Sequence, residues 1–217
     1  MGRQVLALTG DLVELLPEPC RTCLFWELGG PCPDRRSNPA VPPRQAVVAP
    51  TRPLVRKQAW VSAVVQDGQP AGWVVRVEGE VVAHVLAAPS ARFAPRALGL
   101  PSASPDALLL ASVWVQPHWR GRGIGRLLVR ATLKDALRHG CRRVEAFGDR
   151  RWREQACALP AGWLLGEGFD VEMEHPRTPL FAIELGRTVR WAESLEQALG
   201  EILVPRPARA RVTGPAR

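Results

Sequence analysis

Residues 120–126, Arg-Gly-Arg-Gly-Ile-Gly-Arg, place glycines and arginines at the junction between two elements. They follow the apolar run Leu108–Val115 and precede a helical pattern that extends to His139. The first turn of a helix carries N–H groups without partners inside the helix, and the helix dipole adds partial positive charge there. Glycine lets the main chain approach a ligand closely. We therefore predict a pyrophosphate site at this turn, to which the arginine side chains add positive charge.

Three phosphate-binding patterns can be compared with this segment. The P-loop needs Lys-Ser or Lys-Thr after its last glycine, and neither follows here. The dinucleotide fingerprint G-x-G-x-x-G is matched only in its first half, because Arg126 occupies the position of its last glycine. Glu145 does lie at a suitable distance for the acidic residue of that motif. The third pattern, [RQ]-x-x-G-x-[GA], is matched in full by Arg120, Gly123 and Gly125. A turn that binds no ligand is the remaining alternative.

The third pattern is the acyl-CoA signature of the GNAT N-acetyltransferase superfamily, which this chain resembles. The segment Val115–Leu128 is similar to the strand–loop–helix core of that family, and Leu165–Phe169 to its later Gly-Phe element. The likeness covers roughly residues 54–186. It implies an α/β GNAT acyltransferase fold, with a mixed central sheet flanked by helices. It also implies direct transfer of the acetyl group of acetyl-CoA to an amine of a small molecule, a protein lysine or an N-terminus.

The resemblance implies a set of cofactor-binding residues. The strand before the glycine turn would offer main-chain groups to pantetheine, and the N–H groups of the turn would hold the pyrophosphate. The expected residues are Val113, Trp114, Val115, Arg120, Gly121, Arg122, Gly123, Ile124, Gly125 and Arg126. The alternative function is a catalytically weak acyl-CoA-binding regulatory module.

Direct transfer also requires a base for the amine and an acid for the departing thiolate. Glu145 is our first candidate for the base, because it is an acid within an otherwise apolar strand; a salt bridge with a nearby arginine is its alternative role. Glu27 is a weaker candidate. Family members often use a tyrosine as the acid, and this chain has none. The possible substitutes are Cys157, Ser112, His175 and water, and His175 could also contact the substrate from its loop.

The cysteines allow three interpretations. Cys20 and Cys23 have C-x-x-C spacing and Cys32 is close in sequence, but a structural zinc site normally needs a fourth ligand, which is not evident locally. A redox pair would be expected at the start of a helix, whereas Leu24-Phe-Trp indicates a strand. Buried structural thiols are the interpretation that we favour, and we expect no metal.

Composition narrows the class of partner. The net charge of +8 invites a nucleic-acid role, but the positive charge is almost entirely arginine, and much of it lies in the last residues. We therefore expect no nucleic-acid partner. No window holds the roughly 20 apolar residues of a membrane span, and the N-terminus is not a signal-peptide pattern. We expect a cytoplasmic protein without a membrane partner. The family resemblance also implies that the chain can form a homodimer, because dimers are common among its members.

The expected elements follow an alternating α/β order. Residues 1–53 are an N-terminal segment with a first strand at Cys20–Leu28 and a proline-rich loop, residues 54–186 the acetyltransferase domain, residues 187–204 a C-terminal helix, and residues 205–217 a disordered basic tail. Within the domain we predict helices at 54–66, 123–139 and 152–158, a hairpin around Gly79, and strands at 108–115, 143–147, 170–174 and 180–185.

Overall fold

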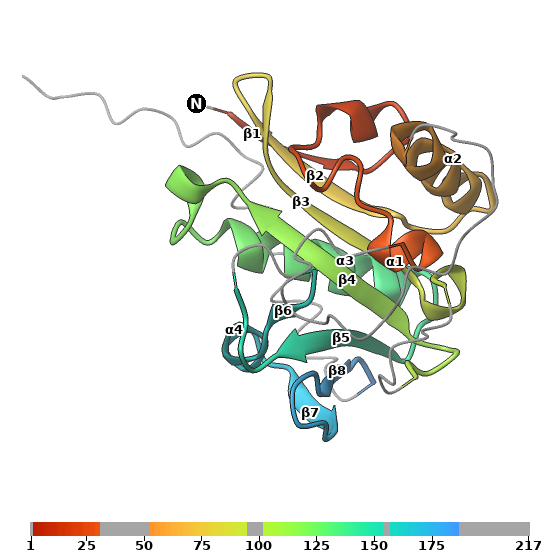
Figure 1. Cartoon of the computed structure of the whole chain (residues 1–217), viewed down its shortest axis with the longest axis vertical. Helices are drawn as coiled ribbons and strands as arrows, with labels where there is room; N and C mark the ends of the chain where they lie inside the picture. Colours follow the sequence, from red (N-terminus) through yellow and green to blue (C-terminus); the bar gives the residue numbers. More distant parts are fainter. Residues whose placement is uncertain (1, 31–52, 95–101, 154–156, 187–217) are drawn as a thin grey trace, which may run out of the picture.

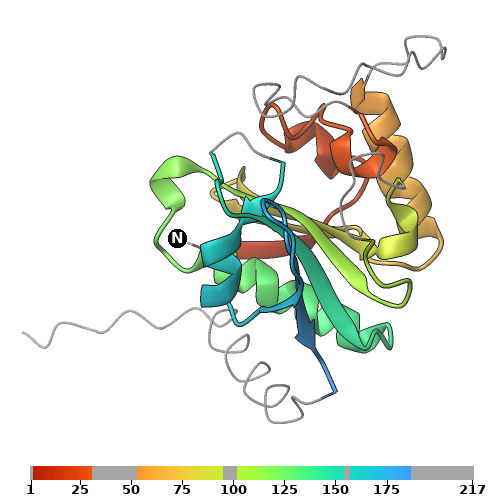
Figure 2. The same cartoon turned by 60° about the horizontal axis from the view of Figure 1, so that its bottom comes forward.

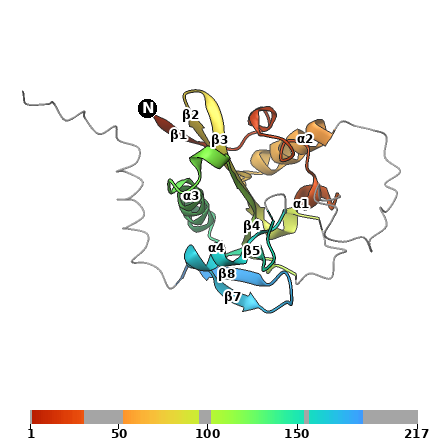
Figure 3. The same ribbon diagram turned by 60° about the vertical axis from the view of Figure 1, so that its left-hand side comes forward.

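The computed structural model describes residues 2–30, 53–94, 102–153 and 157–186. They form a mixed sheet with helices on both faces (Figure 3). The strand order is β1-β2-β3-β4-β5-β8-β7, and β6 pairs with the end of β5. This arrangement confirms the predicted α/β class. In the part of the chain that the structure describes, no helix has the length and apolarity needed to cross a membrane.

The first half of the sheet is an antiparallel meander. Strands β1 (Arg3–Ala7), β2 (Gly72–Val77), β3 (Glu80–Pro89) and β4 (Leu108–Val115) pair in sequence order. The β2–β3 hairpin turns at Glu78 and Gly79, which both have positive φ angles of 52° and 90°, as a tight two-residue turn requires. The helices α1 (Phe25–Leu28) and α2 (Pro53–Gln66) cover one face of this meander.

The second half of the sheet begins with a parallel crossover. Helix α3 (Ile124–Arg138) connects β4 to β5 (Arg143–Asp149), which lies parallel to β4. Strand β8 (Leu180–Glu184) pairs antiparallel with β5, and β7 (Asp170–Met173) completes this edge. The short β6 (Leu159–Pro160) leads into α4 (Ala161–Gly166).

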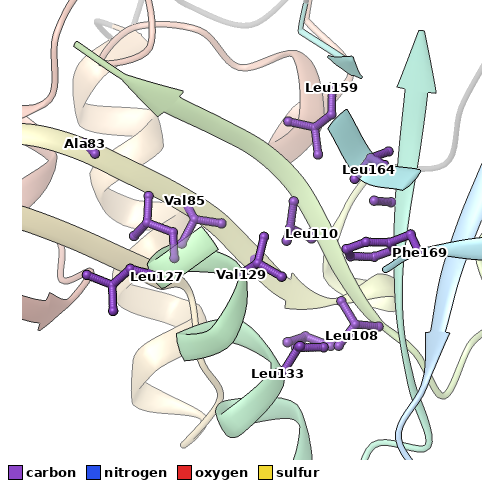
Figure 4. Close-up of a cluster of buried hydrophobic side chains, with 14 of the residues drawn as sticks. Ala83, Val85, Leu108, Leu110, Leu127, Val129, Leu133, Leu159, Leu164 and Phe169 are labelled. Atoms are coloured by element: carbon purple, nitrogen blue, oxygen red, sulfur yellow. The ribbon is translucent and has the colours of Figure 1, made fainter. Parts of the chain in front are cut away.

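Apolar side chains fill the space on both faces of the sheet. On one face, α3 and α4 pack against the sheet in a cluster that includes Leu110, Leu127 and Phe169 (Figure 4). On the other face, α1 and α2 contribute Trp26 and Val61 to a second cluster. Figure 2 shows the sheet running between α2 and α3. The two helical layers fix the positions of the central strands β3, β4 and β5.

The N-terminal segment differs from the prediction. The first strand is Arg3–Ala7, while residues 25–28 form one turn of helix that ends at Gly29 in the left-handed conformation. The turn buries Trp26 and Glu27 together, which the alternation of a strand would place on opposite faces. At 152–158, the described residues outside 154–156 are not helical. The predicted C-terminal helix at 187–204, the tail at 205–217 and most of the proline-rich loop lie outside the described residues.

Candidate active site

Strands β4 and β5 diverge after a short paired stretch. They pair only over Leu108–Leu110 and Val144–Ala146, although β4 continues to Val115 along β3. Figure 1 shows the two strands separating toward the end that carries α4. The last residues of β4 therefore have no ladder partner on the β5 side among the described residues. Main-chain groups at such an edge can pair with an extended ligand.

A β-bulge marks the point of divergence. Leu86 on β3 pairs with Ser112 and the next residue pairs with Leu110, so Ala111 has no opposite residue. A bulge bends the strand and increases its twist. The strand before the bulge is fully buried, whereas Ser112 to Val115 are half-buried. The bulge thus turns the second half of β4 out of the core and into a cleft.

The glycine turn lies at the end of this strand. Gly121 and Gly123 have φ angles of 71° and 77°, and a Cβ built on either would meet no atom within 4 Å. Gly123 is the N-cap of α3, and no side chain caps that helix. The first N–H groups of a helix have no partner inside it, so the N–H groups of Ile124 and Gly125 can donate hydrogen bonds to an anion. The conformation and the open space are both suited to a phosphate group.

The arginines of the turn have separate partners. The Nε of Arg120 donates to the main-chain oxygen of Val115 at 3.0 Å, which ties the turn to the end of β4. Arg126 pairs with Glu167 at 2.9 Å. The guanidinium of Arg122 lies 5.0 Å from the ring centroid of Trp119. Positive charge therefore surrounds the start of α3.

A cleft of about 830 Å³ connects the glycine turn to the face covered by α1 and α2. Of the ten residues expected to bind the cofactor, all but Arg122 line it. Cys157 and Ser112 line it as well. We call the part beside the turn and α4 the cofactor half, and the part beside α1, α2 and β3 the acceptor half. The contact of these residues with a cofactor stays a prediction.

Glu145 does not line the cleft. Its side chain is fully buried and accepts hydrogen bonds from the main-chain N–H of Ser104 at 2.8 Å and from the hydroxyl of Ser104 at 2.6 Å. Arg143 lies 3.3 Å from the same carboxylate. The carboxylate therefore secures the segment that leads into β4. This arrangement includes the arginine salt bridge named above as the alternative to catalysis.

His175 also lies outside the cleft lining. Its Nδ1 accepts hydrogen bonds from the main-chain N–H groups of Thr178 at 2.8 Å and Arg177 at 3.3 Å. These bonds shape the loop between β7 and β8. Of the three predicted catalytic residues, the structure brings only Cys157 to the cleft.

A buried histidine lines the acceptor half and was not singled out in the sequence. His84 lies on β3, is 2 % exposed and stacks on Trp114 with ring centroids 5.9 Å apart. Its Nδ1 has no hydrogen-bond partner within the described ranges. Burial, and next the charge of Lys57, lower the pKa of His84 from 6.5 to about 3. The imidazole is therefore neutral at physiological pH, and leaving its Nδ1 unpaired costs about 1–3 kcal/mol.

An ion pair between Glu27 and Lys57 lies next to the histidine. The Nζ of Lys57 donates to the carboxylate of Glu27 and, at 2.9 Å, to the main-chain oxygen of Cys23. Both side chains are almost completely buried, with exposures of 6 % and 1 % for Lys57 and Glu27. A buried charge needs such a partner. The burial of Lys57 could have been predicted from the sequence, because its spacing places it on the same apolar stripe of α2 as Val61 and Val64.

Three thiols lie in the same half of the cleft. The Sγ atoms of Cys23 and Cys157 are 3.8 Å apart. This contact lowers the pKa of the Cys23 thiol, whereas burial raises the pKa of Cys20 to about 11. Cys23 lies just before Leu24, the N-cap of α1, so the expectation of a strand at Leu24-Phe-Trp was wrong. Within the described residues, no three His, Cys, Asp or Glu side chains are grouped as metal ligands.

Comparison with solved structures shows the same fold in several acetyltransferases. The yncA protein of Salmonella typhimurium, solved with acetyl-CoA, aligns with a TM-score of 0.55 and 14% identity over 85% of this chain and 95% of its own. The PaiA N-acetyltransferase of Thermoplasma acidophilum, in complex with coenzyme A, aligns with a TM-score of 0.55 and 10% identity over 85% of this chain and 99% of its own. The ribosomal-protein-S5-alanine acetyltransferase of Vibrio fischeri aligns with a TM-score of 0.51 and 14% identity over 85% of this chain and 93% of its own.

Sequence comparison gives the family. No curated protein matches the chain. The model of the acetyltransferase (GNAT) family matches residues 40–161, which include β4, the glycine turn, α3 and β5. This match spans more than half of the 217 residues. The chain belongs to the GNAT acetyltransferase family, whose co-substrate is acetyl-CoA.

Proposed function

We propose that the protein is an N-acetyltransferase that moves the acetyl group of acetyl-CoA directly to an amine. The observation that carries the proposal is one continuous cleft. It begins at the uncapped start of α3, follows the side of β4 that β5 leaves unpaired, and reaches His84, a buried residue whose Nδ1 has no hydrogen-bond partner among the described residues. A phosphate site, an open strand edge and a hydrogen-bond acceptor thus occur in the order that the two substrates need.

The cofactor half would hold the coenzyme mainly by main-chain groups. The pyrophosphate would accept hydrogen bonds from the first N–H groups of α3, where the helix dipole favours negative charge. The pantetheine arm would extend along Val113 to Val115, and adding such a strand supplies main-chain hydrogen bonds. The acetyl thioester would then lie near the bulge at Ala111. When bound, acetyl-CoA supplies the electrophilic carbonyl.

The acceptor half would favour a neutral amine. His84 offers a buried nitrogen to which an amine N–H can donate, and that bond would satisfy an atom that has no partner. The pKa of His84 is lowered by burial and by Lys57. The same two causes act on any cation beside it, so the pKa of a bound ammonium would fall as well. The environment thereby contributes to the deprotonation that nucleophilic attack requires.

Two side chains remain as candidates for the proton donor to the departing thiolate. Of the side chains expected as the acid, Ser112 and Cys157 line the cleft, whereas His175 does not. Ser112 directly follows the bulge on β4, next to the expected position of the thioester. We propose Ser112 as the group that donates a hydrogen bond to the leaving sulfur, either directly or through water.

One observation favours the second candidate function, an acyl-CoA-binding module with weak catalysis. The two carboxylates that line the cleft among the described residues are both engaged in ion pairs, Glu27 with Lys57 and Glu167 with Arg126. An engaged carboxylate is a poorer base. Such a module would bind acetyl-CoA as the enzyme does, but would release no CoA in the presence of amines.

The first test is calorimetric titration with acetyl-CoA, with NAD as the control ligand. Gly123→Glu should abolish acetyl-CoA binding, because it places bulk and negative charge where the pyrophosphate is expected. Gly140→Glu is the matched control: its φ of 69° and its open surroundings resemble those of Gly123, but it lies after the other end of α3. Equal affinity in both variants would refute the phosphate site.

Turnover separates the enzyme from the module. CoA release would be followed with 2-phenylethylamine, lysine, an N-terminal peptide and spermidine as acceptors. Release that depends on one of these amines supports the acetyltransferase. If His84→Leu then raises the KM of that amine while leaving the Kd of acetyl-CoA unchanged, His84 contacts the acceptor. Binding of acetyl-CoA without release in the presence of any amine supports the module instead.

A further inference from the structure

Two thiols from distant parts of the sequence meet in the wall of the acceptor half. Cys23 precedes α1 and Cys157 precedes β6, so 134 residues separate them. Their Sγ atoms are 3.8 Å apart and both residues line the cleft. Neither thiol is used in the acetyl transfer proposed above. We refer to Cys23 and Cys157 as the thiol pair.

The main chain on both sides of the thiol pair is held in place by hydrogen bonds. The indole Nε1 of Trp26 donates to the main-chain oxygen of Cys157 at 2.8 Å. The N–H of Cys23 donates to the oxygen of Pro19 at 2.9 Å, and the oxygen of Cys23 accepts from Lys57. These bonds hold the two main-chain segments whose sulfur atoms are 3.8 Å apart. Side-chain rotation can therefore bring the sulfur atoms together without unfolding either segment.

The thiols of this half differ in reactivity. The thiolate is the nucleophilic form of cysteine. The contact with Cys157 lowers the pKa of Cys23, while burial raises that of Cys20 to about 11. Cys23 is thus the thiol that reacts first with an oxidant, and Cys157 is the neighbour best placed to react next. The sequence neighbour Cys20 is disfavoured, although it completes the C-x-x-C motif.

We propose that Cys23 and Cys157 are a redox-modification site that forms a reversible disulfide across the wall of the acceptor half. With hydrogen peroxide as oxidant, the Cys23 thiolate attacks one oxygen, the O–O bond breaks, and a sulfenic acid and hydroxide form. The sulfur of Cys157 then attacks the sulfenic sulfur, and the S–S bond forms as water leaves. In total, two thiols and one peroxide give one disulfide and two waters. A dithiol reverses the reaction by exchange.

The disulfide would act on the acceptor and not on the coenzyme. It would join the segment before α1 to the connection between β5 and β6, and both contribute to the acceptor half. The glycine turn is held separately by Arg120 and Val115. Oxidation should therefore leave the Kd of acetyl-CoA unchanged and lower acceptor-dependent turnover. This effect on turnover rests on the proposed function, whereas formation of the disulfide does not.

The site can be tested on the full-length protein without an acceptor. The purified chain is treated with hydrogen peroxide, its remaining thiols are alkylated with N-ethylmaleimide, and its intact mass and peptides are measured. We expect a loss of two alkylated thiols from the five cysteines of the chain. A peptide linked through Cys23 and Cys157 should appear and should disappear after dithiothreitol treatment.

Variants make the assignment specific. Cys20→Ser should still form the linked peptide, whereas Cys157→Ser should leave a Cys23 sulfenic acid that dimedone traps. Because the wild-type peptide map stands on its own, misfolding of either variant does not obscure the result. A disulfide between Cys20 and Cys23, a link between two chains, or unchanged thiols after peroxide would each overturn the proposal. A changed acetyl-CoA Kd after oxidation would overturn the assignment of its effect to the acceptor half.

Discussion

Replacing Glu145 by glutamine separates its two possible roles. The sequence predicts a catalytic base, whereas the structure places the carboxylate against Ser104 and Arg143, away from the cleft lining. Glutamine keeps the shape of the side chain but turns one oxygen into an NH₂ group. Only one oxygen can then accept from Ser104, and the NH₂ group or the neutral oxygen faces Arg143. We expect Glu145→Gln to lower stability and to leave acetyl transfer largely intact.

The size of the loss follows from the contacts. Each hydrogen bond to a charged group contributes about 1.5–3 kcal/mol. Glutamine keeps one bond to Ser104 in neutral form and weakens the contact with Arg143, so we expect a loss of about 2–3 kcal/mol. For a chain of this size, 1 kcal/mol corresponds to roughly 2–4 °C. The Tm should therefore fall by about 4–12 °C.

Glu172→Gln is the matched control for this variant. Glu172 also pairs with Arg143, at 2.8 Å, but its side chain is 42% exposed, and exposed pairs contribute about 0–1 kcal/mol. The assay combines urea unfolding with kcat measured well below the Tm of the variant. If Glu145→Gln keeps the wild-type Tm and loses most of its kcat, the base assignment from the sequence is right and our structural reasoning is refuted.

Three further predictions concern His84, the Glu27–Lys57 ion pair and the end of β5. The pKa of His84 is lowered from 6.5 to about 3, so the unfolded chain takes up a proton that the folded chain resists as the pH falls. Stability due to this site is thus greatest above pH 6.5 and is lost toward pH 3. Unfolding at pH 6.5 and 4.5 should show wild type losing about 2 kcal/mol more than His84→Phe, and parallel curves would contradict the burial of a neutral imidazole. Lys57→Met should cost about 3–5 kcal/mol, because it leaves the Glu27 charge buried alone. Adding Glu27→Gln should recover most of that loss in the same unfolding assay, and simple additivity would show that the two side chains are not coupled. Gly148→Ala should destabilise the end of β5 by about 1–3 kcal/mol or more, since its Cβ would lie 2.4 Å from Cε2 of Phe181 and 3.1 Å from Cα of Ala161; an unchanged Tm would show that this end of β5 is loosely packed.

The sequence was sufficient to predict those elements that depend on residues close together in the chain. The glycine turn, the helix after it and the strand before it depend on residues close together in the chain, and the structure has all three. The β2–β3 hairpin around Gly79 was equally clear. The first strand was missed because Arg3–Ala7 lies at the edge of the sheet with little burial. An edge strand of this kind lacks the clean alternation of a half-buried one.

The candidate site was harder to predict, because tertiary contacts decide its chemistry. Glu145 is an acid beside the glycine-loop strand, as expected, but the segment containing Ser104 covers its carboxylate. His84 sits in a valine-rich strand, where nothing in the sequence indicates that its ring nitrogen lacks a partner. Lys57 and Glu27 are 30 residues apart in the chain and lie on different helices. No spacing rule connects these side chains.

The family match covers only part of the cleft lining. The matched residues, 40–161, contain the whole glycine turn, whereas Cys20, Cys23, Trp26 and Glu27 lie before them. The segment before the match therefore contributes one part of the acceptor half, whereas Lys57, His84 and Cys157 of the same half lie within the match. The acceptor of a structural neighbour at 10–14% identity therefore does not predict the acceptor of this chain. The identity of the amine has to be sought in the residues that line the acceptor half of this chain: the buried Glu27–Lys57 pair, aromatic rings, the thiol pair and one neutral imidazole.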